Sequence, residues 1–355
     1  MKIPSQLYAL LLILTLLIAA CAAPAVEAPA APEAVSAPEA EAEVADAEAD
    51  ADAEVADADT EADAEVADAD ADADAEVAAE DGGAGHASLV STDWLAENLE
   101  NPAVRLIEVS VIPGVYERGH IPGAVNFRWH TDLMDPTVRD ITSPEAFEQL
   151  AQSAGINQDS TVILYGDNSN WFAAWGVWVF KIYGAEDVRI LDGGRAKWEA
   201  EGRELAVTPP SPAAGDFTVG AVNDGLRALL PDVLEVVEGQ VEADLIDIRS
   251  PAEFEGTIFA PEGMQELSVR AGHIPGAVNV PWSQAVAEDG TFKSQDELRA
   301  LYAAVGVDGS RPIIVYCRIG ERASHTWFLL SELLGYEVAL YDGSWTDWGN
   351  TVGVP

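Results

Sequence analysis

Short apolar runs alternate with segments of helical periodicity from residue 229 to the end of the chain. The apolar runs predict strands at 243–248, 312–316 and 337–341. The helical periodicity predicts helices at 229–237, 295–305 and 322–334. Short, continuous apolar strands that alternate with helices are typical of a mostly parallel sheet covered on both faces. The pattern therefore predicts an α/β fold.

The same ordered landmarks occur twice in the chain. The heptapeptide His-Ile-Pro-Gly-Ala-Val-Asn begins at His120 and again at His273. The apolar run 162–165 corresponds to 313–316, and Asp-Gly-Gly at 192–194 corresponds to Asp-Gly-Ser at 342–344. Because the spacing is nearly constant, we expect two copies of one domain. The predicted domains are 88–206 and 225–355, joined by a linker at 207–224 that is rich in Pro, Ala and Gly.

The N-terminal segment is typical of a secretory signal. Lys2 precedes an apolar run at 7–20, which is shorter than the roughly 20 residues that span a bilayer. The junction before Cys21 resembles a bacterial lipoprotein box, so we expect a signal peptide at 1–20 and a lipidated Cys21. The signal peptide would make the protein extracytoplasmic, and acylation would hold it at the outer face of a membrane. The alternative is a secretory signal followed by a chance Cys.

Residues 21–87 are predicted to be a disordered acidic linker. Positions 21–80 hold 21 Asp and Glu and no Lys or Arg, in an Ala-rich background where Glu-Val-Ala recurs every eleven residues. No large apolar stripe is available for burial, which favours a disordered tether over a supercoiled helix. The formal net charge of the whole chain is −44. This charge argues against a nucleic-acid partner.

Cysteine usage favours one reactive thiol. The chain holds two Cys, Cys21 and Cys317, so a lipidated Cys21 leaves no partner for a disulfide. A lone thiol in an extracytoplasmic protein favours a reactive role, and the alternative is a small buried hydrophobic residue. The sequence shows no metal-ligand cluster or nucleotide-binding loop, so we expect no cofactor.

Cys317 lies between the predicted strand 312–316 and the predicted helix 322–334. Backbone N–H groups in such a loop, together with the helix N-terminus, favour bound negative charge, and a thiolate is such a charge. Arg318 and Arg322 lie within five residues of Cys317 in this acidic chain. A helix N-terminus with adjacent Arg lowers a thiol pKa to between about 3.5 and 7.5. We therefore expect an ionised, nucleophilic Cys317 and an anionic substrate.

Three features together resemble the tandem-domain rhodanese family of thiosulfate and 3-mercaptopyruvate sulfurtransferases, here with a lipoprotein-like start. They are the duplicated His-Ile-Pro-Gly-Ala segment, the Cys-Arg-x-Gly loop after a buried strand, and Asp-Gly-Ser-Trp at 342–345. The resemblance implies that Cys317 takes sulfur from thiosulfate as a persulfide and passes it to cyanide or another thiophilic acceptor. It also implies that the first rhodanese-like domain is inactive, because Gly166 stands where the nucleophile would be.

The resemblance assigns roles to residues around Cys317 as well. It implies that the loop binds the donor through Arg318, Ile319, Gly320, Glu321 and Arg322. A basic residue at position 318 is usual in thiosulfate-type members, whereas mercaptopyruvate-type members usually have Gly there. Arg322 either contacts the sulfonate of the donor or forms a structural ion pair with Glu321.

Other candidate residues lie outside the loop. Asp247 and Arg249 end a predicted strand, and Arg249 touches the donor, braces the loop or forms a solvated ion pair. Trp345 lines the pocket or packs beneath it, and we expect the insertion 256–271 to border the entrance. His120 and His273 have the same place in both copies, including the copy without a Cys, which favours a structural role.

Three rival functions remain open. Phosphatases of related fold separate their Cys and Arg by five residues, whereas four residues separate Cys317 from Arg322. The shorter loop favours a sulfur atom over a phosphoryl group. The other two alternatives are a 3-mercaptopyruvate sulfurtransferase and a non-catalytic surface module that binds a partner or stores sulfur.

Overall fold

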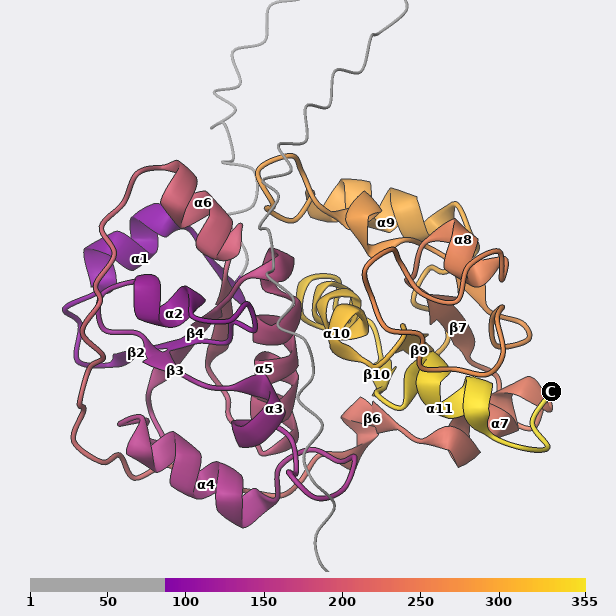
Figure 1. Ribbon diagram of the computed structural model, residues 1–355, viewed down its shortest axis with the longest axis horizontal. Coiled ribbons are helices and arrows are strands. Elements are labelled where there is room, and N and C mark those ends of the chain that lie inside the picture. Colours follow the sequence, from indigo (N-terminus) through magenta and orange to yellow (C-terminus); the bar gives the residue numbers. More distant parts are fainter. Residues whose placement is uncertain (1–86) are drawn as a thin grey trace, which may run out of the picture. The chain divides into compact units, whose positions relative to one another are not determined.

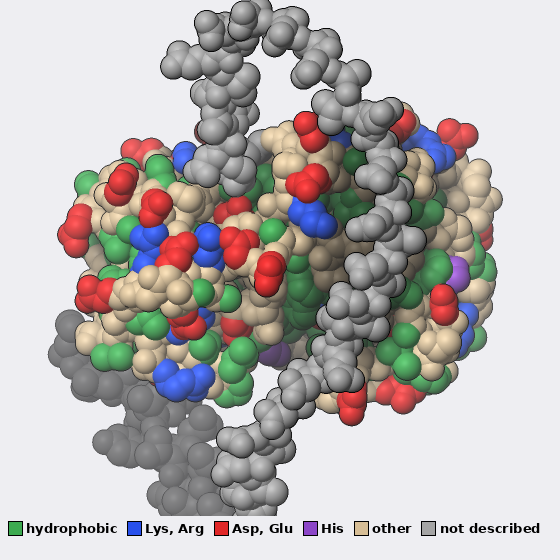
Figure 2. All heavy atoms as spheres, turned by 90° about the horizontal axis from the view of Figure 1, so that it is seen from above, with side chains coloured by type: hydrophobic (Ala, Val, Ile, Leu, Met, Phe, Trp, Pro, Cys, Tyr) green, Lys and Arg blue, Asp and Glu red, His purple; other side chains and the backbone are tan. Residues whose placement is uncertain are grey.

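The computed structural model describes residues 87–355. The predicted signal peptide, Cys21 and nearly all of the predicted acidic linker lie outside the described residues. Within 87–355 no helix is long and apolar enough to cross a membrane. Acidic side chains are spread over the face seen in Figure 2, as expected from a sequence with 41 acidic and 17 basic residues after position 80.

The first domain is built on a five-stranded sheet with the strand order β1-β5-β4-β2-β3. All of its strand pairs are parallel, so helical crossovers connect the strands. The strands are β1 Leu89–Val90, β2 Val104–Glu108, β3 Val125–Asn126, β4 Thr161–Tyr165 and β5 Val188–Leu191. The helices are α1 Thr92–Asn98, α2 Val115–Arg118, α3 Trp129–Asp132, α4 Pro144–Ser153, α5 Trp171–Ile182 and α6 Gly194–Ala200.

The second domain repeats this architecture with the strand order β6-β10-β9-β7-β8, again parallel throughout. Its strands are β6 Arg227–Ala228, β7 Asp244–Asp247, β8 Val278–Asn279, β9 Ile313–Tyr316 and β10 Val338–Tyr341. Its helices are α7 Leu230–Val237, α8 Pro251–Phe254, α9 Gln295–Ala303, α10 Glu321–Phe328 and α11 Ser344–Asn350. The predicted duplication and α/β fold are confirmed (Figure 1).

The elements predicted for the second domain are present, with one difference in the last long helix. α10 passes into a π-helical turn at Leu329–Leu333 instead of continuing as a regular α-helix. The sequence did not predict α8 or α11. Both are too short for the apolar periodicity of a helix to develop.

The two domains contact each other through α5 and α10, which lie side by side in Figure 1. One cluster of buried side chains runs through both domains and includes Trp175 of α5 and Trp327 of α10. The hydroxyl of Ser324 on α10 donates to the carbonyl oxygen of Trp171 at 2.9 Å. The first domain therefore fixes the N-terminal turn of α10, where the Cys317 loop ends.

The predicted linker packs against the first domain. No regular helix or strand occurs between 207 and 223, yet Phe217 is buried and contacts the rings of Phe147 and Phe180. Its backbone N–H donates to the carbonyl oxygen of Ile156 at 3.1 Å. The segment is therefore part of the first core as well as a connection.

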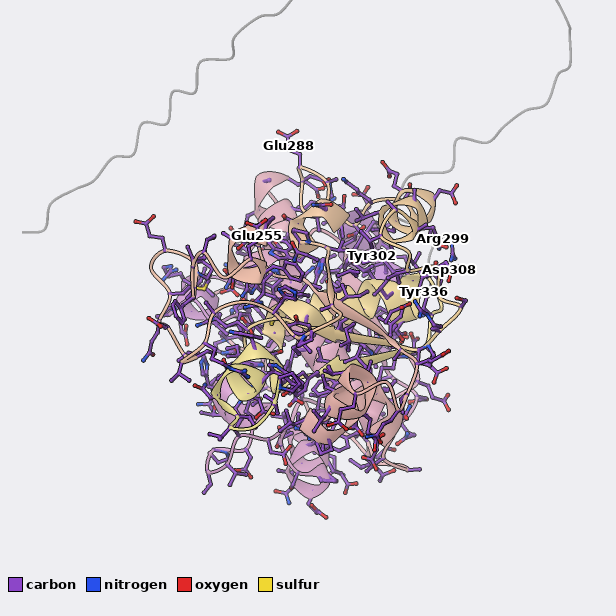
Figure 3. All side chains as sticks on the ribbon, turned by 90° about the vertical axis from the view of Figure 1, so that its right-hand side faces the viewer. Glu255, Glu288, Arg299, Tyr302, Asp308 and Tyr336 are labelled. Atoms are coloured by element: carbon purple, nitrogen blue, oxygen red, sulfur yellow. The ribbon has the colours of Figure 1, made fainter. Side chains whose placement is uncertain are left out.

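A cation–π contact joins α9 to another part of the second domain. Arg299 of α9 and Tyr336 lie at the same edge of the molecule in Figure 3, with the guanidinium carbon 5.6 Å from the ring centroid. This contact ties α9 to the segment that enters β10. Tyr302, from the same helix, is fully buried.

Candidate active site

Cys317 directly follows β9, the central strand of the second sheet, at its carboxyl end. Its backbone N–H donates to the hydroxyl of Ser344 at 3.1 Å, and its carbonyl oxygen accepts from the N–H of Trp345 at 3.1 Å. Ser344 in turn donates to the carbonyl oxygen of Tyr341 at 2.8 Å. The start of α11 thus anchors the first residue of the loop.

Gly320 makes the turn that brings a backbone donor to the sulfur. Its φ is +103°, and a Cβ atom there would lie 2.7 Å from the ring of Trp175 and 2.9 Å from the carbonyl oxygen of Asp342. No other residue type fits such a position without a shift of its neighbours. The N–H of Gly320 donates to Sγ of Cys317 at 3.1 Å.

The thiol of Cys317 also contacts a carboxylate. Sγ donates to Oε2 of Glu321, the first residue of α10, across 3.7 Å. Cys317 is 0% exposed and Glu321 is 4% exposed, so water does not screen this contact. The family resemblance implies that Glu321 belongs to the donor-binding loop, but its contact with the sulfur was not predicted.

The prediction that the loop lowers the pKa of Cys317 is wrong. Burial raises the pKa of the thiol, and the carboxylate of Glu321 raises it further. The guanidinium of Arg322 and the backbone N–H groups of Gly320 and Ala323 lower this pKa but do not outweigh the two larger effects. In this structure, burial and the carboxylate of Glu321 therefore oppose ionisation of the thiol.

Arg322 lies in a buried ion pair. Its two terminal nitrogens donate to the carboxylate of Glu253 at 3.0 and 3.2 Å, and its Nε lies 3.9 Å from Glu321. Burial acts to raise the pKa of Glu253, but Arg322 and Ser250 lower it overall. Arg322 therefore forms a structural ion pair, which was one of the two alternatives, but its main partner is Glu253 and not Glu321. A contact between Arg322 and the donor stays a prediction.

Arg318 is the loop arginine without a carboxylate partner in the described part of the chain. Its Nη1 donates to the carbonyl oxygen of Gln265 at 2.8 Å, and its Nε is buried without a hydrogen bond. Thr346 fixes its backbone by donating twice to the Arg318 carbonyl oxygen, at 3.0 and 2.8 Å. Its charge is therefore available to an anion at the loop.

Arg249 pairs with Asp247 beneath the loop. Nε lies 3.0 and 3.1 Å from the two carboxylate oxygens, and Nη2 contacts the same group. The alternative of a solvated pair is excluded, because Arg249 is 1% exposed and Asp247 is fully buried. The guanidinium carbon lies 5.0 Å from the ring centroid of Trp345, which is itself buried. Trp345 thus packs on Arg249, and donor contact by Arg249 stays a prediction.

The insertion 256–271 lies against the loop. The hydroxyl of Ser268 donates to the carbonyl oxygen of Trp345 at 3.2 Å, and the indole N–H of Trp345 donates to the Arg270 carbonyl oxygen at 3.0 Å. Together with the contact between Arg318 and Gln265, these bonds place the insertion beside the active-site loop. That the insertion borders an entrance to the site stays a prediction.

The first domain contributes a residue that the sequence analysis missed. Nη2 of Arg139 donates to the carbonyl oxygen of Ile319 at 2.6 Å and to that of Asp342 at 2.8 Å. Arg139 therefore joins the active-site loop to the turn before α11. A lone Arg in a segment without periodicity gives no signal for such a contact in one sequence.

The corresponding loop of the first copy is filled by its own side chain. The amide oxygen of Asn170 accepts the N–H of Gly166 at 3.0 Å, and its amide nitrogen donates to Leu191 at 2.8 Å. A Cβ atom at Gly166 would lie 2.2 Å from the carbonyl oxygen of Val109. A Cys at this position would therefore require a backbone shift.

Both repeated histidines have structural partners. Nδ1 of His120 lies 3.0 Å from the carbonyl oxygen of Tyr116, and its ring stacks on that of Tyr116. His273 has the same relation to Phe254, with Nδ1 at 2.8 Å from the carbonyl oxygen and stacked rings. The structural role favoured by the sequence is confirmed.

Known proteins match both halves of the chain. The rhodanese-like domain family matches residues 91–201 and 231–351. Sulfur carrier protein TtuD of Thermus thermophilus is 52% identical over 273 residues, which cover 75% of this chain and 95% of TtuD. A Mycobacterium bovis protein named "Putative thiosulfate sulfurtransferase 1" is 51% identical over 269 residues, which cover 75% of this chain and 96% of that protein.

A solved structure agrees with these matches. SseA from Escherichia coli, described as a 3-mercaptopyruvate sulfotransferase with the rhodanese fold, is 33% identical with a TM-score of 0.61. The match covers 73% of this chain and 98% of SseA. The two matched segments, the repeated sheets and the Cys317 loop lead to one conclusion: this chain belongs to the rhodanese family and has two tandem rhodanese-like domains.

Proposed function

We propose that this protein is a thiosulfate sulfurtransferase that carries sulfur on Cys317 as a persulfide. The observation that carries the proposal is the position of Sγ at the carboxyl end of β9, where the N–H of Gly320 donates to it at 3.1 Å. Such a donor stabilises negative charge that develops on sulfur. The relative named for thiosulfate sulfurtransferase activity, 51% identical, supports the same donor.

The reaction has two half-reactions. In the first, the sulfur of Cys317 attacks the outer sulfur of thiosulfate, the new S–S bond forms, and the old S–S bond breaks with its electron pair to release sulfite. In the second, cyanide or another thiophilic acceptor attacks the outer sulfur of the persulfide. The sulfurated acceptor leaves, which is thiocyanate when the acceptor is cyanide, and Cys317 is regenerated.

Arg318 supports thiosulfate as the donor. No carboxylate of the described residues pairs with the guanidinium of Arg318. The guanidinium can therefore pair with the sulfonate oxygens of the thiosulfate dianion. Asp247 supports the site indirectly by holding Arg249 beneath Trp345. The likeness to SseA favours 3-mercaptopyruvate as the second candidate donor.

Storage of sulfur without turnover is the other candidate function. The relative TtuD is named a sulfur carrier protein, and a carrier would need the same persulfide on Cys317. A carrier differs from an enzyme in its second half-reaction, because it releases sulfur to a specific acceptor and not to cyanide.

The test measures the intact mass of the protein after each half-reaction. Thiosulfate should add one sulfur atom to the wild type, and cyanide should remove it with release of thiocyanate. Cys317→Ser should gain no mass. A Ser variant that turns over like the wild type would exclude covalent sulfur transfer, and a stable persulfide that cyanide does not discharge would favour the carrier. Comparison of kcat/KM for thiosulfate and 3-mercaptopyruvate identifies the donor.

We also propose that the mature protein is extracytoplasmic and anchored to a membrane by a lipid on Cys21. The basis is the sequence alone: Lys2, the apolar run 7–20 and the small residues before Cys21. Mass spectrometry of the mature N-terminus tests this. A diacylated Cys21 at the first position is expected, and an unmodified N-terminus at another residue would contradict the anchor.

A further inference from the structure

A cavity of about 430 Å³ lies beside the active-site loop, with Arg139 of the first domain in one wall and residues of the second domain in the others. Two of its lining residues hold the loop. Thr346 donates from its hydroxyl to the carbonyl oxygen of Arg318 at 2.8 Å, and Arg139 donates to that of Ile319 at 2.6 Å. Cys317 does not line the cavity, so this space is separate from the site of sulfur transfer.

Arg139 brings a positive charge to the cavity without a carboxylate partner. Its side chain is exposed, and Nη2 donates to the carbonyl oxygens of Ile319 and Asp342 at 2.6 and 2.8 Å. Within residues 87–355, Nε and Nη1 have no hydrogen-bond partner, and the guanidinium forms no ion pair. The N–H groups of these two nitrogens are therefore available to an anion.

Asp347 brings a negative charge to the same cavity without a cationic partner. One carboxylate oxygen accepts the hydroxyl of Tyr341 at 2.8 Å, and the other lies 3.5 Å from the hydroxyl of Thr351. Both donors are neutral, and no Lys or Arg in the described part of the chain pairs with this carboxylate. Since Asp347 is half-buried, water screens its charge only in part, and a cation in the cavity would be favoured.

The other charges at the cavity already cancel. Arg227 donates to both carboxylate oxygens of Asp342 at 2.8 and 3.0 Å, and to Asp140 at 2.6 Å. The cavity therefore presents one free cation and one free anion, and these two groups do not pair with each other. A dianion such as sulfate would meet a single free guanidinium and would be repelled by Asp347.

We propose that this cavity binds a zwitterion, an α-amino acid with an apolar side chain. Its carboxylate pairs with the guanidinium of Arg139, and its ammonium group pairs with Asp347. Leu229, which is 50% exposed, and the ring of Tyr341 provide apolar surface for its side chain. A ligand with one charge would leave the other group of the protein without a partner and partly removed from water, which is unfavourable.

The proposal goes beyond the sulfurtransferase reaction, so binding is measured without a sulfur donor. Isothermal titration calorimetry of the whole chain with L-leucine gives the dissociation constant. Two matched probes are 4-methylpentanoate, which is leucine without its ammonium group, and 3-methylbutylamine, which is leucine without its carboxylate. We expect a dissociation constant of about 1 mM or tighter for leucine, and binding at least about tenfold weaker for each probe.

Two variants remove one charge each. Arg139→Gln should weaken leucine binding at least about tenfold and remove the preference for leucine over 3-methylbutylamine. Asp347→Asn keeps an acceptor for Tyr341, and it should weaken leucine binding by a similar factor and remove the preference over 4-methylpentanoate. A residue with only a structural role would not change these preferences selectively.

Two control variants lie outside the cavity. Arg118 is an exposed arginine of the first domain that donates to the carbonyl oxygen of Pro113 at 3.0 Å, so Arg118→Gln matches Arg139→Gln. Glu255 is an exposed carboxylate at the end of α8, labelled in Figure 3, and Glu255→Gln matches Asp347→Asn. Both controls should bind leucine like the wild type.

The wild type alone can refute the proposal. It fails if leucine shows no binding at about 10 mM, or if leucine binds no more tightly than sulfate or either probe. It also fails if Arg139→Gln and Asp347→Asn bind leucine like the wild type, because binding would then occur elsewhere. If a variant does not fold, the comparison of leucine with its two probes on the wild type decides.

Discussion

Replacement of Asp192 by Asn should stabilise the protein at neutral pH. Asp192 follows β5, and its carboxylate accepts the backbone N–H of Phe292 from the second domain at 2.9 Å. Its counterpart Asp342 pairs with Arg227 at 2.8 and 3.0 Å, but no described cation contacts Asp192. Burial, reinforced by Asp289, therefore raises the pKa of Asp192 to about 6. An Asn keeps the hydrogen-bond acceptor without the charge.

The size of the effect follows from this pKa. The ordinary value is 3.8, so the folded state raises the pKa of Asp192 by about two units, or roughly 2–3 kcal/mol. Because the folded protein binds this proton more tightly than the unfolded chain, stability falls as pH rises from about 4 through about 6. Above pH 6 the full cost of the buried charge applies, and Asp192→Asn removes it.

Urea denaturation at a series of pH values measures the difference. The variant should be more stable by about 2–3 kcal/mol at pH 7.5, and the gain should disappear near pH 4, where Asp192 is protonated in both states. Asp289→Asn is the control: Lys197 lowers the pKa of Asp289 to about 2, so loss of this charge should give no gain at pH 7.5. A gain in Asp192→Asn that is independent of pH, or a loss at pH 7.5, would refute the reasoning.

Three further predictions concern the active-site loop. Glu253→Gln leaves the buried Arg322 without its carboxylate partner. The free energy of unfolding, measured by chemical denaturation, should therefore fall by about 3–5 kcal/mol. An unchanged value would contradict the buried pair. Arg139→Gln loses the bonds to the loop carbonyl, so single-turnover persulfide formation on Cys317 should slow while the melting temperature changes little, and an unchanged rate would exclude a positioning role. Arg318→Gly should lower kcat/KM for thiosulfate more than for 3-mercaptopyruvate, and equal losses would contradict pairing with the sulfonate.

The sequence predicted the fold because the information was repeated and periodic. Two copies with the same landmarks predict the same sheet twice, and the apolar runs 312–316 and 337–341 coincide with β9 and β10 to within one residue at each end. The position of Cys317 at the carboxyl end of a buried strand follows from the same periodicity. Local patterns of this kind depend on short-range spacing, which a single chain displays directly.

The electrostatics of the site could not be predicted in the same way. The sequence places Arg318 and Arg322 near Cys317, but their effect depends on which groups they contact after folding. Glu253 is distant in the sequence and neutralises Arg322, whereas Glu321 turns toward the sulfur. The spacing Ser250-x-x-Glu253 is typical of a capping box but does not indicate an ion pair with Arg322, and the carboxylate forms both in the structure.

Ser344 was also missed, although the repeat contained a signal. In the first copy the corresponding residue is Gly194, with φ +56°, and Ser344 keeps nearly the same backbone with φ +55°. A serine in this left-handed conformation is strained, so its side chain must provide something that glycine does not. The hydroxyl accepts the N–H of Cys317 at 3.1 Å.

The two copies differ in the loop that follows the central strand of each sheet. In the first copy, the N–H of Gly166 donates to Asn170, whereas the corresponding N–H of Cys317 donates to Ser344, and the carbonyl of Val109 blocks a side chain at Gly166. In the second copy, the N–H of Gly320 donates to the sulfur of Cys317. The first domain still acts on that site through α5 and Arg139, since both contact the loop or the helix that follows it. A Cys placed at position 166 would therefore not by itself create a second active site, because the carbonyl of Val109 leaves no space for the side chain.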